Sequence, residues 1–452
     1  MTHLFSSVRL QVIRPFPLTP LAPLVLHLSL APVGALLVNK SNRCSHIMSS
    51  LKIKRKHFEN PFPDYCDQAA LDVLDGNEIM PSYKVRKCVD AKWQSITAKI
   101  DKYIEKYKKD ASVYTGTAGL AMLYLQKDAK NPEYLKFAKD YTQTSSIPSK
   151  RRFTFLCGDT GAMAIRAVVC NEMGDKSEVK SIIKNLIGLK TDAVNYKADV
   201  ANEYLYGRAG YLFSLLYVNK NISPPPIEES VIKGVIDAML KAGNKLSLEL
   251  GSKPPLMYHW HDSYYLGAAH GLTGILYLLL QVPQYLDETQ LNELIRPTVN
   301  YLATLRFPSG NYPSSLESQS GDKYVQWCHG APGFLYLFSQ AYKVFKDPSY
   351  LELALQAGDV VWQRGLLRKG YSICHGVSGN AYCFLELYQT TNELKHLYRA
   401  LKFAEWCVDY TKEHEEYVPD RPLSLYEGIA GPMYLLIDIQ KPMEAKFPGF
   451  TL

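Results

Sequence analysis

The sequence lacks several patterns on which common protein classes depend. None of its nine cysteines lies in a Cys-x-x-Cys pair, which excludes a zinc ribbon and a thioredoxin-like motif. The alternation of apolar and polar residues that is typical of β-strands is almost absent. The long apolar runs, such as 267–286 and 327–342, are interrupted by His, Gln, Pro or several Gly. They fall short of the roughly 20 apolar residues of a membrane span, so buried helices are favoured over a polytopic membrane protein.

Acidic residues are missing from the chain before Glu59. Eight of the 51 basic residues lie in that segment, so the remainder has 43 basic against 44 acidic residues. A nucleic-acid surface needs clustered basic charge, and nucleic acid is therefore excluded as a partner. The Leu- and Pro-rich composition predicts a flexible N-terminal extension over residues 1–55, with Met48 as a candidate internal start.

The odd number of cysteines is typical of free thiols in a reducing compartment, so we expect a cytoplasmic protein. Three alternatives stay open. The acid-poor N-terminus also has the composition of a targeting peptide, the basic segment Lys52–Lys56 can contact an anionic membrane surface, and part of the protein can be nuclear.

A Gly-x-x-Gly step occurs seven times, each time before an apolar, helix-like stretch. The first glycines are 42 to 64 residues apart, at Gly116, Gly158, Gly207, Gly271, Gly330, Gly376 and Gly428. Between them lie second helical patterns such as Leu394–Trp406, whose apolar residues recur three and four apart. This pattern predicts helical-hairpin repeats, which must stack on their neighbours to bury their apolar faces.

The last repeat, Tyr426–Ile439, is as apolar as the middle ones, whereas an open solenoid needs polar terminal repeats. We therefore predict an all-α, closed α/α toroid over residues 56–452, with seven hairpins and fourteen helices in an inner and an outer ring. The helices that begin at glycine should lie inside, because glycine lets backbones approach closely at a narrow mouth.

Two Cys-His pairs occupy the same register in adjacent repeats. Cys328-His329 precedes Gly330 and Cys374-His375 precedes Gly376, so the two thiols should meet. Two thiolates and one imidazole would give zinc three ligands and an open fourth position. The alternative is that they are small buried residues, which is common for free cysteine.

An open zinc site of this kind can bind a substrate thiol and keep it deprotonated near neutral pH. His270 has the matching register one repeat earlier. A histidine there can protonate the carbanion that forms when a thiolate adds to an electron-poor alkene. The constellation therefore predicts thiol activation followed by conjugate addition.

Two acidic residues, Asp159 and Glu427, also flank glycine steps. Paired carboxylates at the mouth of a toroid would be compatible with a carbohydrate-cleaving enzyme. That hypothesis leaves both cysteines without a role, and one zinc per chain would argue against it.

The segments 157–161, 267–272, 327–333 and 374–376, in this order among the glycine steps, resemble the LanC-like proteins, eukaryotic relatives of the bacterial lanthionine cyclases. The resemblance runs from about Lys56 to the C-terminus. It implies an α/α toroid in which Cys328, Cys374 and His375 bind zinc, while His329 is only a neighbour. It also implies His270 as the acid/base residue, with Asp159 orienting it.

The resemblance further implies that glutathione is a co-substrate whose thiol is added to dehydroalanine or dehydrobutyrine residues of proteins or peptides. The implied glutathione contacts are Lys56, Lys369, Tyr417, Val418, Pro419, Asp420 and Arg421. The chain departs from the family at Tyr417, where an arginine is usual, although Arg421 is close enough to replace it. Tyr324 stands where bacterial cyclases have arginine, so lanthipeptide cyclisation is not implied. A glutathione-binding adaptor that contacts signalling proteins without turnover is the alternative.

Overall fold

The computed structural model describes residues 55–66, 68–69, 73–75, 78–79, 83–143, 153–409 and 419–452. The chain divides into two units, Met1–Lys54 and Arg55–Leu452. The expected N-terminal extension, including Met48, lies outside the described residues except for Arg55 and stays a prediction. None of the described helices is both long enough and apolar enough to cross a membrane.

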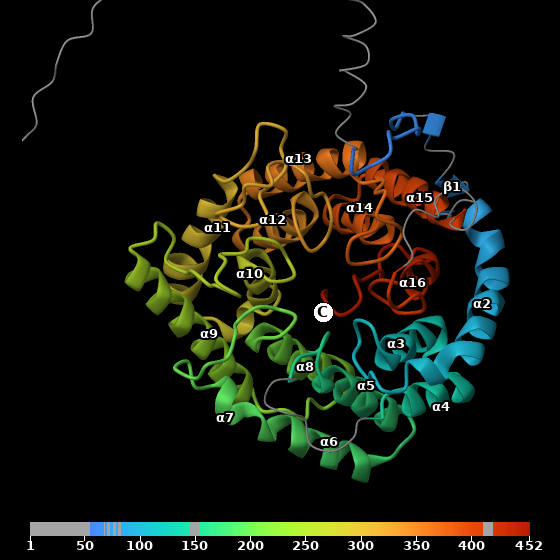
Figure 1. Cartoon of the computed structure of the whole chain (residues 1–452), viewed down its shortest axis with the longest axis horizontal. Coiled ribbons are helices and arrows are strands. Elements are labelled where there is room, and N and C mark those ends of the chain that lie inside the picture. Colours follow the sequence, from blue (N-terminus) through green and yellow to red (C-terminus); the bar gives the residue numbers. More distant parts are fainter. Residues whose placement is uncertain are drawn as a thin grey trace, which may run out of the picture. The chain divides into compact units, whose positions relative to one another are not determined.

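Seven helices of the described residues form an inner ring (Figure 1). They are α3 (Thr117–Asp128), α5 (Asp159–Glu172), α8 (Arg208–Asn221), α10 (Leu272–Leu280), α12 (Ala331–Phe345), α14 (Val377–Thr391) and α16 (Ala430–Asp438). Each packs on the next, and α16 packs on α3. The ring is therefore closed, and the predicted toroid is confirmed.

Seven helices of the described residues form the outer ring. They are α2 (Tyr83–Tyr103), α4 (Pro132–Tyr141), α6 (Lys176–Gly188), α9 (Glu229–Leu250), α11 (Arg296–Ala303), α13 (Pro348–Arg364) and α15 (Leu394–Val408). Most follow the inner helix on which they pack, but α2 comes first in the chain and packs on α16, the last helix. The seventh hairpin thus joins the two ends of the unit.

The remaining described elements are short. They comprise the helix α7 (Lys190–Ala193), the 3₁₀ helices η2 (Ile104–Lys106) and η3 (Pro283–Tyr285), and the π-helix η4 (Gln290–Ile295), which runs into α11. The strands β1 (Leu74–Asp75) and β2 (Glu78–Ile79) form a small antiparallel hairpin.

Local sequence sets where several outer helices begin. The side chain of Asn131 accepts hydrogen bonds from the backbone N–H groups of Glu133 and Tyr134, and Pro132 is the first residue of α4. Asp347 and Pro348 begin α13 in the same way. An Asn or Asp cap followed by proline satisfies free N–H groups and presets φ for the first turn.

The paired glycines leave room for the loop that precedes each inner helix. A Cβ on Gly161 would overlap the carbonyl oxygen of Phe155, and one on Gly119 would overlap that of Val113. Gly330 in addition has φ +93°, a region that side chains disfavour. Crowding between helices, the expected reason for these glycines, is therefore only part of the explanation, because most of the close contacts are with the chain's own preceding loop.

The C-terminal segment fills the centre of the ring (Figure 1). The buried ring of Phe450 contacts aromatic side chains from several repeats, namely Tyr204, Tyr277, Trp327 and Tyr336. Phe447 packs on Trp327 as well, with ring centroids 5.2 Å apart. The loops before the inner helices, here called the mouth, are where the predicted site residues lie.

Candidate functional site

The loops before α12 and α14 bring the two predicted thiols together. The side chains of Cys328 and Cys374 are hydrogen-bonded to each other, and both are buried. The amide Nε2 of Gln326 also donates to Sγ of Cys328, at 3.0 Å. Equal register in adjacent repeats thus does place two cysteines side by side although 46 residues separate them.

Of the two thiols, Cys328 loses its proton more easily and Cys374 keeps its proton. The hydrogen bond from Cys374 is the main cause that lowers the pKa of Cys328 to about 6, despite its burial. Burial, and then the neighbouring Cys328, raise the pKa of Cys374. The hydroxyl of Tyr114 and the charge of Lys369 both favour a thiolate at Cys374. The pair therefore carries a buried thiolate near neutral pH, which is the form that binds metals.

The two histidines next to the thiols have different surroundings. Burial, with help from Lys369, lowers the pKa of His375 to about 4, so its imidazole is neutral and suited to bind a metal. His329 instead pairs through its backbone with Gln326, and its ring lies near Tyr265 and Tyr324.

By donor type, burial and protonation, Cys328, Cys374 and His375 fit zinc. Their spacing is looser than that of a formed site. In the part of the chain that the structure describes, three donor atoms lie within 4.8 Å of one another only at Cys170, Asp175 and Glu178. The zinc ligands therefore stay a prediction.

His270 is held by a carboxylate that the sequence analysis did not nominate. Its Nδ1 lies 2.8 Å from Oε2 of Glu203, which is only 2% exposed. Glu203 also accepts the backbone N–H groups of Leu205 and Tyr206, so its position is fixed. Asp159 begins α5, and its expected role in orienting His270 stays a prediction. One feature of the sequence could have pointed to Glu203. It is an acidic residue close to two tyrosines, four residues before the repeat glycine Gly207.

Aromatic rings form a wall beside His270. The ring of Tyr206 is nearly parallel to the imidazole, at 6.2 Å and 6°, and Trp260 lies at 6.5 Å and 14°. Trp260 precedes a two-residue turn in which His261 and Asp262 have φ of +45° and +57°. Positive φ at both central residues is what a tight hairpin turn of this length requires. Repeat spacing gave no signal for this wall.

The loop of His270 also contacts the loop that carries Cys328. Tyr265 lies 5.7 Å from the ring of His270 and 6.1 Å from that of His329. A Cβ on Gly267 would overlap the carbonyl oxygen of Cys328. The acid/base candidate and the thiol pair therefore belong to one mouth.

Several predicted glutathione contacts also gather there. The backbone N–H of Arg368 donates to the carbonyl oxygen of Lys56 at 3.0 Å, which places Lys56 beside the exposed Lys369. Burial, and then the charge of Asp420, raise the pKa of Glu427, whereas Lys369 and Arg421 lower it.

The remaining contacts are less well placed. Pro419 is buried in the adjoining segment. Tyr417 and Val418 lie outside the described residues.

The closed ring of α-helical hairpins is the fold that the resemblance to the LanC-like proteins implied, and the thiol pair lies at its mouth. The family model described as "Lanthionine synthetase C-like protein" matches residues 107–452, and the chain belongs to this family. Among curated proteins it is similar to "Glutathione S-transferase LANCL1" of Danio rerio, with 41% identity over 88% of this chain and 100% of that protein. Among solved structures it is similar to "Nisin cyclase", with a TM-score of 0.61 and 16% identity over 80% of this chain and 96% of that one. The latter likeness supports the fold.

Proposed function

We propose that this protein is a zinc-dependent enzyme that adds the thiol of glutathione to dehydroalanine or dehydrobutyrine residues in proteins or peptides. The single observation that carries the proposal is the placement of the Cys328–Cys374 pair and the Glu203-held His270 at one mouth. The name of the Danio rerio relative supports glutathione as the thiol.

In this proposal Cys328, Cys374 and His375 would hold the zinc, which would supply Lewis acidity that keeps the glutathione sulfur deprotonated. Glu203 accepts the Nδ1 proton of His270, and this leaves Nε2 to exchange a proton. His270 takes the thiol proton as the thiolate is formed. The sulfur then bonds to Cβ of the dehydroamino acid, and the alkene electron pair moves to Cα.

His270 returns its proton to Cα, so that the thioether forms with no oxidant or reductant. The cationic Lys369 and Arg421, with Lys56 beside them, would bind the carboxylates of glutathione. Asp420 has the charge to accept its ammonium group. The exposed position of Lys369 fits a role in binding rather than in stabilising the fold.

The cytoplasmic location and the additional partners, namely signalling proteins and a membrane surface reached through the basic N-terminal segment, stay predictions. Cell fractionation of the full chain tests the location.

Incubating the purified protein with glutathione and a dehydroalanine peptide tests the proposal, with thioether formation followed by mass spectrometry. We expect product with the wild type and none above background with Cys374→Ala. Zinc-loaded protein that binds glutathione but never forms product would instead support the adaptor hypothesis.

A further inference from the structure

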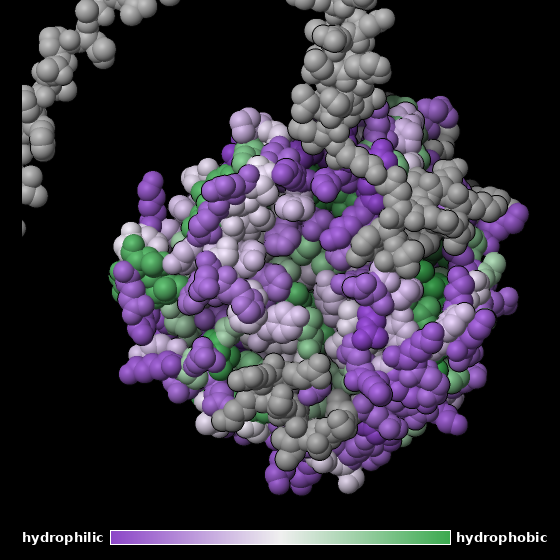
Figure 2. All heavy atoms as spheres, in the orientation of Figure 1, coloured by the Kyte–Doolittle hydropathy of each residue, from purple (hydrophilic) through white to green (hydrophobic). Residues whose placement is uncertain are grey.

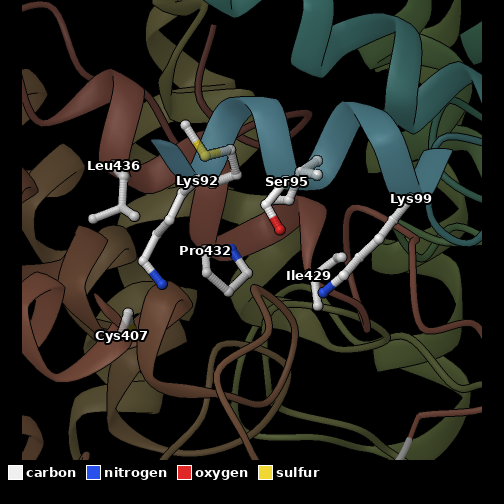
Figure 3. A pocket seen from close by; sticks show the side chains of 9 residues that line it. Lys92, Ser95, Lys99, Cys407, Ile429, Pro432 and Leu436 are labelled. Carbon is white, nitrogen blue, oxygen red and sulfur yellow. The ribbon is translucent and has the colours of Figure 1, made fainter. Parts of the chain in front are cut away.

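An open groove lies between α2 and the start of α16, here called the α2 groove. Its first part is a narrow crevice of about 80 Å³ whose floor is mostly apolar (Figure 3). The floor residues are Ile96, Cys407, Ile429, Pro432, Met433 and Leu436. Figure 3 shows Lys92 and Lys99 reaching from α2 across this floor.

A second part continues the groove along the same helix. It has a volume of about 460 Å³ and shares Lys99 and Ile429 with the first part. Tyr103, Tyr107 and Lys106 line it, together with Asp420 and Arg421. The groove therefore ends at residues that are predicted to contact glutathione.

Three lysines lie along the groove. Lys92 and Lys99 are seven residues apart on α2, which returns to nearly the same side of the helix after two turns. Lys106 follows in η2 and lines the second part of the groove. In the part of the chain that the structure describes, none of the three forms an ion pair with a carboxylate. Lys106 lies over the ring of Tyr103, at 5.3 Å, and Arg421 lies over that of Tyr107, at 5.9 Å.

Two other lysines at this side of the ring do pair with acidic side chains. Lys127 contacts Asp90 at 3.0 Å, and Lys84 contacts Asp409 at 2.7 Å. Figure 2 shows hydrophilic side chains gathered over the α2 and α4 side of the ring. Among the residues that the structure describes, Asp420 is the one acid that lines the groove, so this described lining has a net positive charge above an apolar floor.

This charge pattern selects among ligands. An apolar floor with cations at its rim complements a chain that carries apolar side chains flanked by carboxylates. The enzyme proposed above must hold a polypeptide while its dehydroamino acid reaches the mouth. Because the groove runs to Asp420 and Arg421 beside Glu427, a bound polypeptide can enter the mouth without leaving the surface.

We infer that the α2 groove binds the acidic flank of the polypeptide substrate. This inference rests on the proposed function and deepens it, since it assigns a substrate class: proteins whose dehydroamino acid lies near Asp, Glu and large apolar residues. Lys92, Lys99 and Lys106 contact the carboxylates, and Tyr103, Ile429 and Leu436 contact the apolar side chains.

The test compares three acceptors in the zinc-loaded full chain. They are a dehydroalanine peptide with acidic flanks, one with the same apolar residues and lysine flanks, and N-acetyl-dehydroalanine methyl ester. We expect Lys92→Gln/Lys99→Gln/Lys106→Gln to raise KM for the acidic peptide about tenfold, since three exposed charge contacts are lost. The KM for the ester and for glutathione should not change. Arg421 is left intact because it is a predicted glutathione contact.

The matched control is Lys176→Gln/Lys180→Gln/Lys184→Gln, which removes the same charge from α6. An equal KM for the acidic peptide in the two triple variants would overturn the inference. So would a groove variant that loses binding to phosphatidylserine vesicles but keeps its peptide KM, since the groove would then be a membrane contact.

A failure of the proposed reaction is distinguishable from a failure of the groove. If no acceptor reacts, fluorescence anisotropy with the acidic peptide, carrying serine in place of dehydroalanine, measures binding directly. Weaker binding by the groove variant alone would support the groove, and equal binding by both variants would overturn it.

Discussion

At the scale of single residues, Glu203 decides how His270 can act. A buried carboxylate that holds Nδ1 fixes both the tautomer and the ring orientation. We expect Glu203→Gln to lower kcat for thioether formation about 10- to 100-fold, because the amide keeps the shape but loses the charge that stabilises a protonated ring. The KM for glutathione should stay the same. Steady-state kinetics with a dehydroalanine peptide measure both constants.

A double-mutant cycle separates positioning from a general loss of structure. If Glu203 acts through His270, adding Glu203→Gln to His270→Ala should cost almost nothing further. Asp159→Asn is the matched comparison, because Asp159 was the residue expected to orient the ring. A larger loss for Asp159→Asn than for Glu203→Gln would reverse the assignment.

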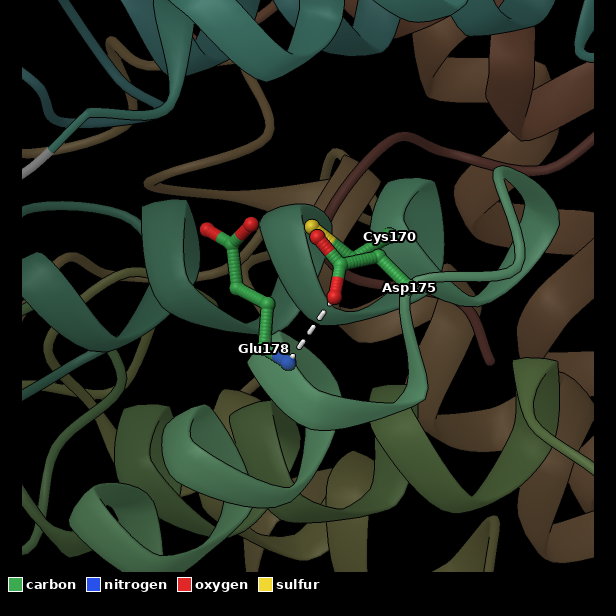
Figure 4. A group of neighbouring side chains, drawn as sticks. All are labelled: Cys170, Asp175 and Glu178. Atoms are coloured by element: carbon green, nitrogen blue, oxygen red, sulfur yellow. Dashed lines mark hydrogen bonds between the residues drawn. The ribbon is translucent and has the colours of Figure 1, made fainter.

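Zinc content distinguishes the predicted ligands from the tightest cluster in the described residues. Cys170, Asp175 and Glu178 lie close together (Figure 4), but Lys139 contacts both carboxylates and Arg166 contacts Glu178. These cations lower the pKa of Glu178 to about 2 and neutralise the cluster. We therefore expect about one zinc per chain in the wild type and in Cys170→Ala, and almost none in Cys328→Ala. Elemental analysis of purified protein checks this, and metal loss in Cys170→Ala would contradict it.

Much of the site could be predicted because register is a property of the sequence. Residues at equal positions in adjacent repeats must meet when the repeats stack, which is how Cys328 and Cys374 could be paired. Glu203 could not be found in this way, because its contact with His270 depends on the path of an irregular loop. The wall of Tyr206 and Trp260 was missed for the same reason, because both residues lie on irregular loops.

At the scale of elements, the repeat glycines allow a direct test. Gly161→Ala would place a methyl group against the carbonyl of Phe155 and the side chain of Val113. We expect a loss of about 1–3 kcal/mol in the free energy of unfolding, as for other overpacked sites. Gly188→Ala is the control, because nothing lies within 4 Å of its Cβ position. That change should be neutral or stabilise α6 by up to about 1 kcal/mol. If urea unfolding showed equal losses of stability for Gly161→Ala and Gly188→Ala, contact with the preceding loop would not explain the repeat glycines.

The helical hairpins could be predicted because glycine steps and apolar spacing are local signals. The partner of the last helix could not, since α2 is the first long helix in the chain and no repeat glycine precedes it. Nor did periodicity reveal the π-helical start of α11, because the six residues of η4 are too few for a different helical period to show in the sequence.

At the scale of the whole molecule, the ring is held from its centre as well as from its circumference. Phe450 is fully buried against aromatic side chains of several repeats. Phe450→Ala should therefore cost about 3–5 kcal/mol in the free energy of unfolding. Met443, half exposed in the same segment, is the control, and Met443→Ala should stay within about 0.5 kcal/mol. Thermal or urea unfolding measures both changes. A small loss of stability in Phe450→Ala would show that contacts between neighbouring helices hold the ring closed without the C-terminal segment.

Asp438 links this centre to the ring and gives the molecule a pH dependence. Its carboxylate accepts hydrogen bonds from Gln126 on α3, Tyr382 on α14 and the backbone N–H of Lys446. Burial nevertheless raises its pKa from 3.8 to about 7. The folded protein then holds this proton more tightly than the unfolded chain. The contribution to stability is therefore complete below about pH 4 and is lost as the pH rises toward 7.

Urea unfolding between pH 4 and 7 tests this prediction against Asp438→Asn, which has no proton to lose at this position. We expect the wild type to lose up to about 4 kcal/mol more than the variant over this range, at about 1.4 kcal/mol for each unit of pKa difference. The two proteins should have similar stability at pH 4, because the protonated acid and the amide each place a donor among the same three groups. If the wild type instead gains stability over the variant as the pH rises, the three hydrogen bonds outweigh burial. Asp438 would then be an ionised link that holds the centre of the ring together.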